Sequence, residues 1–168
     1  MKKKYCFDTS GISNPLETMP EDIHESAWTK IKACIEGGMF AVTTEIYDEM
    51  IHITGTVGEC IRANGAALVL EIGEGEWDWD SYTGHVTRMQ DQHRQFISEF
   101  NNNRRGTACL NDISIIGLAK TLKLPVVSME TPIRNQDSLK RRIPDICDLE
   151  GLEHLLFSDF CRREGLKF

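Results

Sequence analysis

Acidic side chains stand where predicted strands end and where predicted helices begin. They are Asp8, Glu45, Glu49, Asp112 and Glu130. In open α/β sheets, ligands bind at the carboxyl ends of the strands, so we expect these carboxylates to face one site. Carboxylates that lie close together repel one another, which raises some of their pKa values unless a divalent cation neutralises the group.

The donor set consists of oxygen ligands alone, which favours Mg²⁺ or Mn²⁺ over Zn²⁺. Such ions bind few carboxylates together with waters and substrate phosphates, so the set predicts phosphodiester hydrolysis. Structural interpretations stay open beside this one. Asp8 can belong to a turn, Glu45 and Glu49 can stabilise a helix N-terminus through its dipole, Asp112 can cap a helix, and Glu130 can be a loop residue.

Two basic segments flank the third and fourth acidic positions in the sequence. The chain of 168 residues carries 19 Lys and Arg against 26 Asp and Glu, a net charge of −7. A nuclease still needs cations beside the backbone phosphates. The candidates for RNA binding are Arg104, Arg105, Arg134, Lys140, Arg141 and Arg142. Solvated loop charges are the alternative interpretation.

Three further side chains have both a functional and a structural interpretation. Trp77 and Trp79 lie in an acidic stretch and are suited to stacking on bases, but packing against a helix or a partner is the favoured interpretation. His93 lies on the apolar face of a predicted helix, where a packed histidine is favoured over a metal ligand.

The elements that must position these residues alternate between strand and helix. In the first half, the pattern predicts a strand at 4–7, a turn at 9–13, a helix over 23–35, a strand at 39–43 and a helix over 44–61. The segment 66–70 fits a strand or a helix. In the second half, the pattern predicts a helix over 82–100, a helix capped by Asn111 or Asp112, a strand at 124–129, a helix from Pro144, a strand at 154–157 and a helix over 158–164.

This alternation implies right-handed crossovers and a mostly parallel sheet that is covered on both faces. The predicted fold is therefore a three-layer α/β/α domain, and the length fits a single domain over residues 1–168.

The motifs resemble those of PIN-like domains in their order and spacing. Asp8 follows the strand in KYCFDTS, Glu49 lies in VTTEIYDEM, Asp112 opens NDISIIGLAK, and Glu130 follows PVVSM. The resemblance spans most of the chain and is nearest to a prokaryotic PIN-like branch that shares the IPDIC segment and a short last helix. PIN domains are metal-dependent ribonucleases, and many bacterial members of the VapC kind are toxins of toxin–antitoxin pairs.

The resemblance implies roles for individual residues. Asp8 corresponds to the metal ligand of the first strand, Glu49 to the second-motif glutamate, and Asp112 to the aspartate that opens the third-motif helix. Glu130 stands where the family usually has an aspartate, and Glu45 is the alternative to Glu49. The resemblance further implies Mg²⁺ or Mn²⁺ as cofactor, an RNA substrate, an antitoxin partner and a homodimer.

Composition indicates the compartment. No window approaches the roughly 18 consecutive apolar residues of a membrane span, and no apolar stretch follows the basic start as in a signal peptide. The six cysteines are scattered without a metal-binding spacing, which predicts free thiols. We therefore expect a cytoplasmic protein without a membrane partner.

The prediction is a metal-dependent endoribonuclease that acts as the toxin of a toxin–antitoxin pair. Two alternatives stay open. The first is a catalytically silent PIN-like module that binds or regulates a partner, and the second is a phosphatase or a DNA-directed nuclease built on the same carboxylates.

Overall fold

A short parallel sheet lies at the centre of the chain. The computed structural model describes residues 2–167. Strand β1 (Tyr5–Phe7) pairs with β2 (Phe40–Ala41) on one side and with β3 (Val126–Val127) on the other, and β4 (His154–Leu155) pairs with β3. The order is β2-β1-β3-β4, and all pairs are parallel. The carboxyl ends of the strands therefore lie along one edge.

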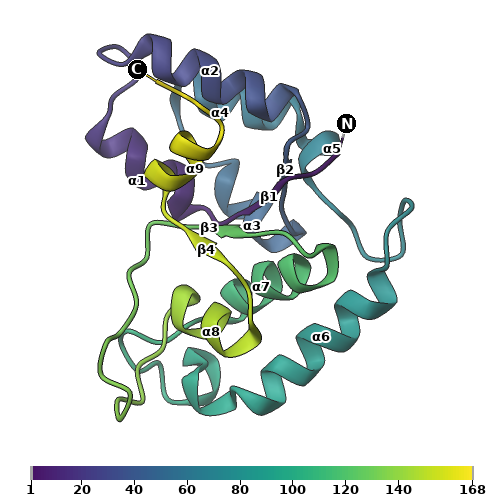
Figure 1. Cartoon of the computed structure of the whole chain (residues 1–168). Helices are drawn as coiled ribbons and strands as arrows, with labels where there is room; N and C mark the ends of the chain where they lie inside the picture. The colour runs from purple at the N-terminus through teal and green to yellow at the C-terminus, as the bar shows by residue number, and fades with distance from the viewer. Residues whose placement is uncertain (1, 168) are drawn as a thin grey trace.

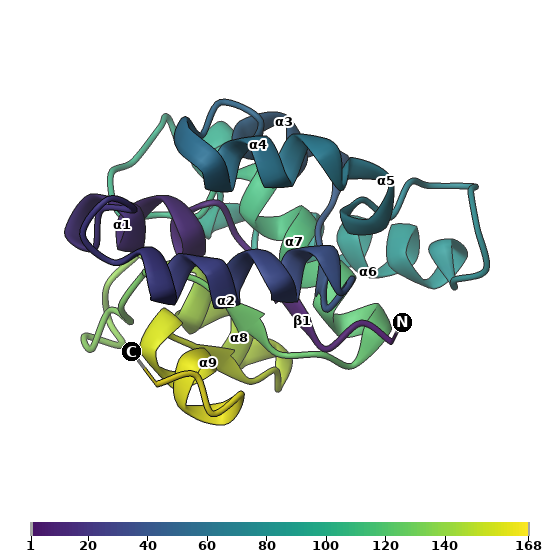
Figure 2. The ribbon, with the colours of Figure 1, turned by 90° about the horizontal axis from the view of Figure 1, so that it is seen from above.

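Helices cover both faces of this sheet. Figure 1 shows α2, α4 and α9 on one side of the strands and α6, α7 and α8 on the other, and Figure 2 shows the same layers from above. The helices are α1 (Ser10–Thr18), α2 (Glu25–Glu36), α3 (Thr44–Met50), α4 (Gly55–Ala63), α5 (Gly65–Leu68), α6 (Trp79–Gln92), α7 (Leu110–Leu122), α8 (Ile143–Glu150) and α9 (Phe157–Arg163). The predicted three-layer α/β/α architecture is confirmed.

The core is built on the buried first strand and on a helix that is apolar nearly all round. All three residues of β1 are buried, and the ring of Phe7 stacks on Phe40 at a centroid distance of 3.9 Å, with Phe160 edge-on at 5.1 Å. Every residue of α7 from Ile113 to Ala119 is buried, as expected for a helix enclosed between a sheet and another helix. Burial of this kind is the main stabilising contribution to a domain.

The predicted helix over 44–61 is two helices. Helix α3 ends at Met50 and α4 begins at Gly55, where φ is +80°. A Cβ atom at position 58 would lie 1.8 Å from the carbonyl oxygen of Ile53, so this tight connection needs glycine there. The apolar spacing of three and four continues across the break because both helices bury a face in the same core.

The predicted turn at 9–13 and the predicted helix over 82–100 are also corrected. Helix α1 begins at Ser10, directly after the first strand, and contains Pro15. Helix α6 ends at Gln92 and is followed by two short 3₁₀ turns, Arg94–Phe96 and Ser98–Phe100. The residue between those turns, Ile97, is extended because it forms a β-bridge with Ala108.

The remaining predictions need smaller adjustments. The segment that fitted either a strand or a helix is both, because α5 ends at Leu68 and Val69 then forms a β-bridge with Val42. The N-cap residue of α7 is Cys109, and Asp112 takes part in the same capping box by accepting from the Cys109 backbone nitrogen. The described cysteines are free, as predicted.

A buried carboxylate joins α6, α7 and α8 at the end away from the strand exits. Glu150, 7% exposed, accepts bonds from both terminal nitrogens of Arg88 at 3.0 and 2.6 Å and contacts His93 Nε2 at 2.7 Å. Lys120 Nζ lies 3.9 Å from the same carboxylate. The bonds from Arg88, followed by those from His93, lower the pKa of Glu150 to about 2, although burial acts in the opposite direction.

We expect Glu150→Gln to lower the free energy of unfolding by about 3 kcal/mol at pH 7, since it removes a buried carboxylate that Arg88 holds in a two-bond ion pair. The folded-state pKa lies below the unfolded value of about 4.3, so the contribution is present above that pH and is lost as the pH falls toward 2. Urea titrations at several pH values measure it.

Glu153→Gln is the matched control, because it breaks a pair with Arg163 in which the Glu153 side chain is 52% exposed. Such an exposed pair contributes at most about 1 kcal/mol. An equal loss in the two variants at pH 7 would contradict the role given to Glu150.

Candidate acidic active site

Asp8 lies at the carboxyl end of β1 and is 6% exposed. Its Oδ2 accepts a bond from the backbone nitrogen of Ser10 at 3.0 Å and a second bond from the Ser10 hydroxyl. Burial raises the pKa of Asp8, and the charge of Glu49 raises it further, while the bonds from Ser10 act against both. Ser10 Oγ also accepts from Met129 N at 3.1 Å, which ties the exit of β1 to the exit of β3.

Asp112 is the third residue of α7, and its position follows from the helix cap. Its Oδ2 accepts from the backbone nitrogen of Cys109 at 2.8 Å, so the carboxylate is held at the N-terminus of the helix. Burial raises the pKa of Asp112 to about 7, and the charges of Asp8 and Glu130 raise it as well. The capping bond opposes this shift but does not cancel it.

Glu130 follows β3 and reaches toward α8. Its Oε2 accepts from the backbone nitrogen of Ile143 at 2.8 Å, at the first residue of that helix. Burial raises the pKa of Glu130, the charges of Asp8 and Asp145 add to the shift, and the charge of Arg142 lowers it. The longer side chain at this position thus caps a helix and still lies close enough to Asp8 for that charge to raise its pKa.

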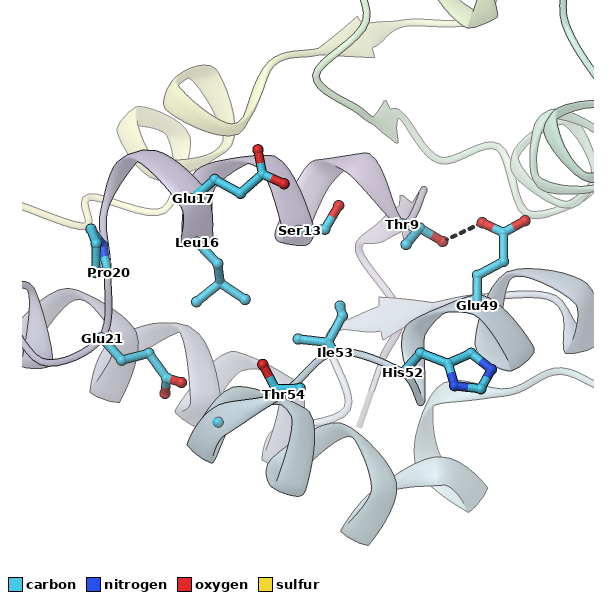
Figure 3. A pocket seen from close by; sticks show the side chains of 11 residues that line it. Thr9, Ser13, Leu16, Glu17, Pro20, Glu21, Glu49, His52, Ile53 and Thr54 are labelled. Carbon is cyan, nitrogen blue, oxygen red and sulfur yellow. Dashed lines mark hydrogen bonds between the residues drawn. The ribbon is translucent and has the colours of Figure 1, made fainter.

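Glu49 lies on α3, the helix that follows the second strand, and is the fourth carboxylate of this group. Its Oε2 accepts from the hydroxyl of Thr9 at 2.8 Å, a bond drawn in Figure 3, and its Oε1 accepts from Asn111 Nδ2 at 2.6 Å. Its charge acts on Asp8. Glu45 lies one turn earlier on α3 and lines a different pocket, beside α6 and α7. The structure therefore places Glu49 beside Asp8.

Four carboxylates from four separate segments thus act on one another at one edge of the sheet. Repulsion among Asp8, Asp112 and Glu130 and their burial disfavour the charged forms, and a divalent cation would offset both. Among residues 2–167, no three His, Cys, Asp or Glu side chains are placed to share one metal ion. Mg²⁺ commonly binds one or two carboxylates and keeps several waters, so the chemistry of this donor set fits that ion.

A groove of about 500 Å³ runs away from the acidic edge. Figure 3 shows Leu16 and Ser13 of α1 facing Ile53 in the connection between α3 and α4, with Thr9 and Glu49 at one end. At that end the groove is lined by Glu49, which is the only exposed member of the four carboxylates. The groove therefore gives access to the site from this side.

The two basic segments meet in space. The aliphatic part of Lys140 packs beside Gly106, in the loop that carries Arg104 and Arg105. Arg104, Arg105, Arg134 and Lys140 are exposed. The guanidinium of Arg141 donates to three backbone carbonyls of its own loop, and it lies over the ring of Phe96 at 5.0 Å. Arg142 lies near enough to Glu130 to lower its pKa. RNA binding by these six residues stays a prediction.

The structure also shows how the aromatic and histidine side chains are used. Trp77 packs against Tyr82 at a centroid distance of 5.4 Å, and His93 is buried against Glu150, as the packing interpretation has it. Two residues that orient Glu49, Thr9 and Asn111, were missed, because the sequence places them far from it. His154 was also missed, and its Nε2 lies 2.7 Å from the hydroxyl of Ser128.

The fold and the site define an α/β protein with a parallel sheet and a carboxylate cluster at the strand exits. The chain belongs to the family described as "Domain of unknown function (DUF4411)", whose model matches residues 5–168. Among solved structures, it is similar to the DNA-bound VapBC from Salmonella typhimurium, with a TM-score of 0.44 and 16% identity over 93% of this chain and 99% of that chain. No curated protein matches the chain. No helix within residues 2–167 has the length and apolar character to cross a membrane.

Proposed function

We propose that the protein is a metal-dependent endoribonuclease. The observation that carries this proposal is the convergence of Asp8, Glu49, Asp112 and Glu130 from four segments onto one edge of the sheet, where Glu49 raises the pKa of Asp8, and Asp8 raises the pKa values of Asp112 and Glu130. Buried like charges are costly without compensation, so such a cluster is typical of a cation site. The resemblance of its motifs to PIN-like domains supports RNA as the substrate.

Each carboxylate has a distinct task in this proposal. Asp8 and Asp112, the more deeply placed pair, would hold Mg²⁺ or Mn²⁺, with Glu49 and Glu130 at the margins. When bound, the cation lowers the pKa of a coordinated water and offsets negative charge on the phosphate. Ser10 and Asn111 keep the carboxylates of Asp8 and Glu49 oriented. The exposed basic side chains would bind phosphates along the backbone.

The biological setting is part of the same proposal. The motif resemblance supports a toxin of a toxin–antitoxin pair that works in the cytoplasm, binds a small antitoxin protein and forms a homodimer. A short neighbouring reading frame that encodes a DNA-binding N-terminus would support the antitoxin partner.

A second candidate function is a catalytically silent binding module. The observation that favours it is that the carboxylates of Asp112 and Glu130 are engaged by backbone nitrogens of helix N-termini. Calorimetric titration with Mg²⁺ and Mn²⁺ separates the two candidates. Binding supports the nuclease, and a chain that binds neither ion favours the module.

Cleavage of defined oligonucleotides tests the nuclease directly. Single-stranded RNA, single-stranded DNA and a DNA flap are incubated with the protein in Mg²⁺, in Mn²⁺ and in EDTA. We expect RNA cleavage that depends on either ion and stops in EDTA. Cleavage of DNA but not RNA would move the assignment to a DNA-directed nuclease, and cleavage that persists in EDTA would contradict the metal dependence.

A further inference from the structure

A second pocket shares a wall with the acidic site. Its volume is about 390 Å³, within the usual range of small-molecule sites. Asn111 and Leu110, at the start of α7, form that wall, and Asn111 donates to Glu49. The opposite wall is α6, which contributes Tyr82, Val86 and Gln90. A molecule in this pocket would therefore lie next to the carboxylate cluster.

The pocket is firmly built. Helices α6 and α7 approach so closely at Gly117 that a Cβ atom there would lie 2.4 Å from Val86 Cγ2. Tyr82 is 4% exposed at the base and is held against Trp77. Ile72, which is 55% exposed, also lines the pocket and leaves an apolar side chain at its solvent side. Apolar side chains on both sides of a slot are suited to the faces of a flat ring.

Two polar side chains at this pocket have no hydrogen-bonding partner among the described residues. Within residues 2–167, neither Glu45 nor Gln90 makes a side-chain hydrogen bond or an ion pair, in contrast to the four carboxylates of the acidic site. A carboxylate only accepts hydrogen bonds, and an amide both donates and accepts. The charge of Glu45 acts on the pocket, since it adds to burial in raising the pKa of Tyr82 to about 12.

We propose that this pocket binds a guanine base of single-stranded RNA next to the acidic site, with Glu45 and Gln90 reading its Watson–Crick edge. Guanine is the base that presents two adjacent donors, N1–H and N2–H₂, beside the acceptor O6. The two oxygens of Glu45 accept from the donors, and the Gln90 amide donates to O6. Adenine presents one donor beside one acceptor, cytosine presents one donor beside two acceptors, and uracil presents one donor between two acceptors, so Glu45 repels part of each edge.

This inference rests on the proposed function, because it names the base that lies beside the reacting phosphate. It gives Glu45 a task different from that of Glu49, although both lie on α3 one turn apart. It also accounts for Ile72 at the solvent side of the pocket, where an apolar side chain covers one face of the bound base. The consequence is a nuclease that selects the nucleotide at its cleavage point by contact with the base.

Binding of the four nucleoside 5′-monophosphates tests the pocket without cleavage. They share the phosphate, so differences among them report the base. In nuclear magnetic resonance titrations in EDTA, we expect GMP to bind at least tenfold more tightly than AMP, CMP or UMP, with shifts at Tyr82 and Gln90. Glu45→Gln is expected to reduce the affinity for GMP about tenfold or more, as loss of a bidentate base contact does.

Asp48→Asn is the matched control, because it removes one exposed carboxylate from the same helix at a residue that lines another pocket. It should leave the preference for GMP intact. Equal binding of the four nucleotides, or equal weakening by Asp48→Asn and Glu45→Gln, overturns the inference. Selective GMP binding without any cleavage would support the pocket and reject the nuclease. Cleavage that shows no base preference, together with equal binding of the four nucleotides, would support the nuclease and reject the pocket.

Discussion

Asp8→Asn is expected to reduce metal-dependent RNA cleavage by about 10³-fold, equivalent to roughly 4 kcal/mol of transition-state stabilisation. Asparagine has the same shape and still accepts the bonds that Ser10 donates at the end of β1. The change therefore removes a negative charge while it keeps the local structure. It is measured as initial rates on one labelled RNA in Mg²⁺ and in Mn²⁺, together with calorimetric affinity for each ion.

The control must remove the same charge from a position outside the site. Asp91→Asn does so at an exposed residue of α6 and should cleave at the rate of the unchanged protein. Thermal unfolding of both variants shows that each is folded. If Asp8→Asn cleaves RNA as fast as Asp91→Asn does, the carboxylate of Asp8 has no part in the reaction, and the proposed function is rejected.

The position of Asp8 could be predicted because its information is local. A short apolar strand followed by an acidic residue leads to the strand exit in any parallel sheet. The same holds for Asp112, since an acidic residue at the first turn of an apolar helix is a common capping pattern. In both cases, the structure places the carboxylate at the edge of the sheet, and its burial is what raises the pKa values.

The choice between Glu45 and Glu49 could not be made from spacing, because residues four apart lie on the same side of a helix. It depends on where α3 lies relative to Thr9 and Asn111, and the bonds from those two residues to Glu49 are tertiary contacts. Local periodicity contains no such information.

The break between α3 and α4 was hidden for a related reason. The apolar residues keep a helical spacing of three and four across the connection. This spacing lets two separate helices bury one face in the core as well as it would a single helix. The sequence nonetheless indicates the break at Gly55 and Gly58, because glycine inside an apolar helical pattern is typical of a helix terminus or of a close backbone approach. The structure shows both, in the positive φ of Gly55 and in the contact of Gly58 with the Ile53 carbonyl.

The metal-free protein is expected to become more stable when Asp112 is changed to asparagine. Asparagine retains an oxygen that accepts from Cys109 N, so the cap of α7 is kept. The change removes a buried charge that Asp8 and Glu130 repel. The folded-state pKa of about 7 lies above the unfolded value of about 3.9, so the unchanged protein loses stability as the pH rises from about 4 to 7. In EDTA at pH 8, the variant should gain up to about 4 kcal/mol.

Unfolding measured at pH 4 and pH 8, with EDTA or with Mg²⁺, tests this expectation. The gain should fall to less than about 1 kcal/mol at pH 4, where Asp112 is protonated in the folded chain and about half protonated in the unfolded chain. Mg²⁺ should stabilise the unchanged protein at pH 8 more than the variant, because an ion that binds only the folded state adds to its stability. A variant that is less stable than the unchanged protein in EDTA at pH 8 would show that Asp112 stabilises the fold as a helix cap. A variant that is more stable in EDTA and gains less from Mg²⁺ would instead support the proposal that Asp112 is a metal ligand.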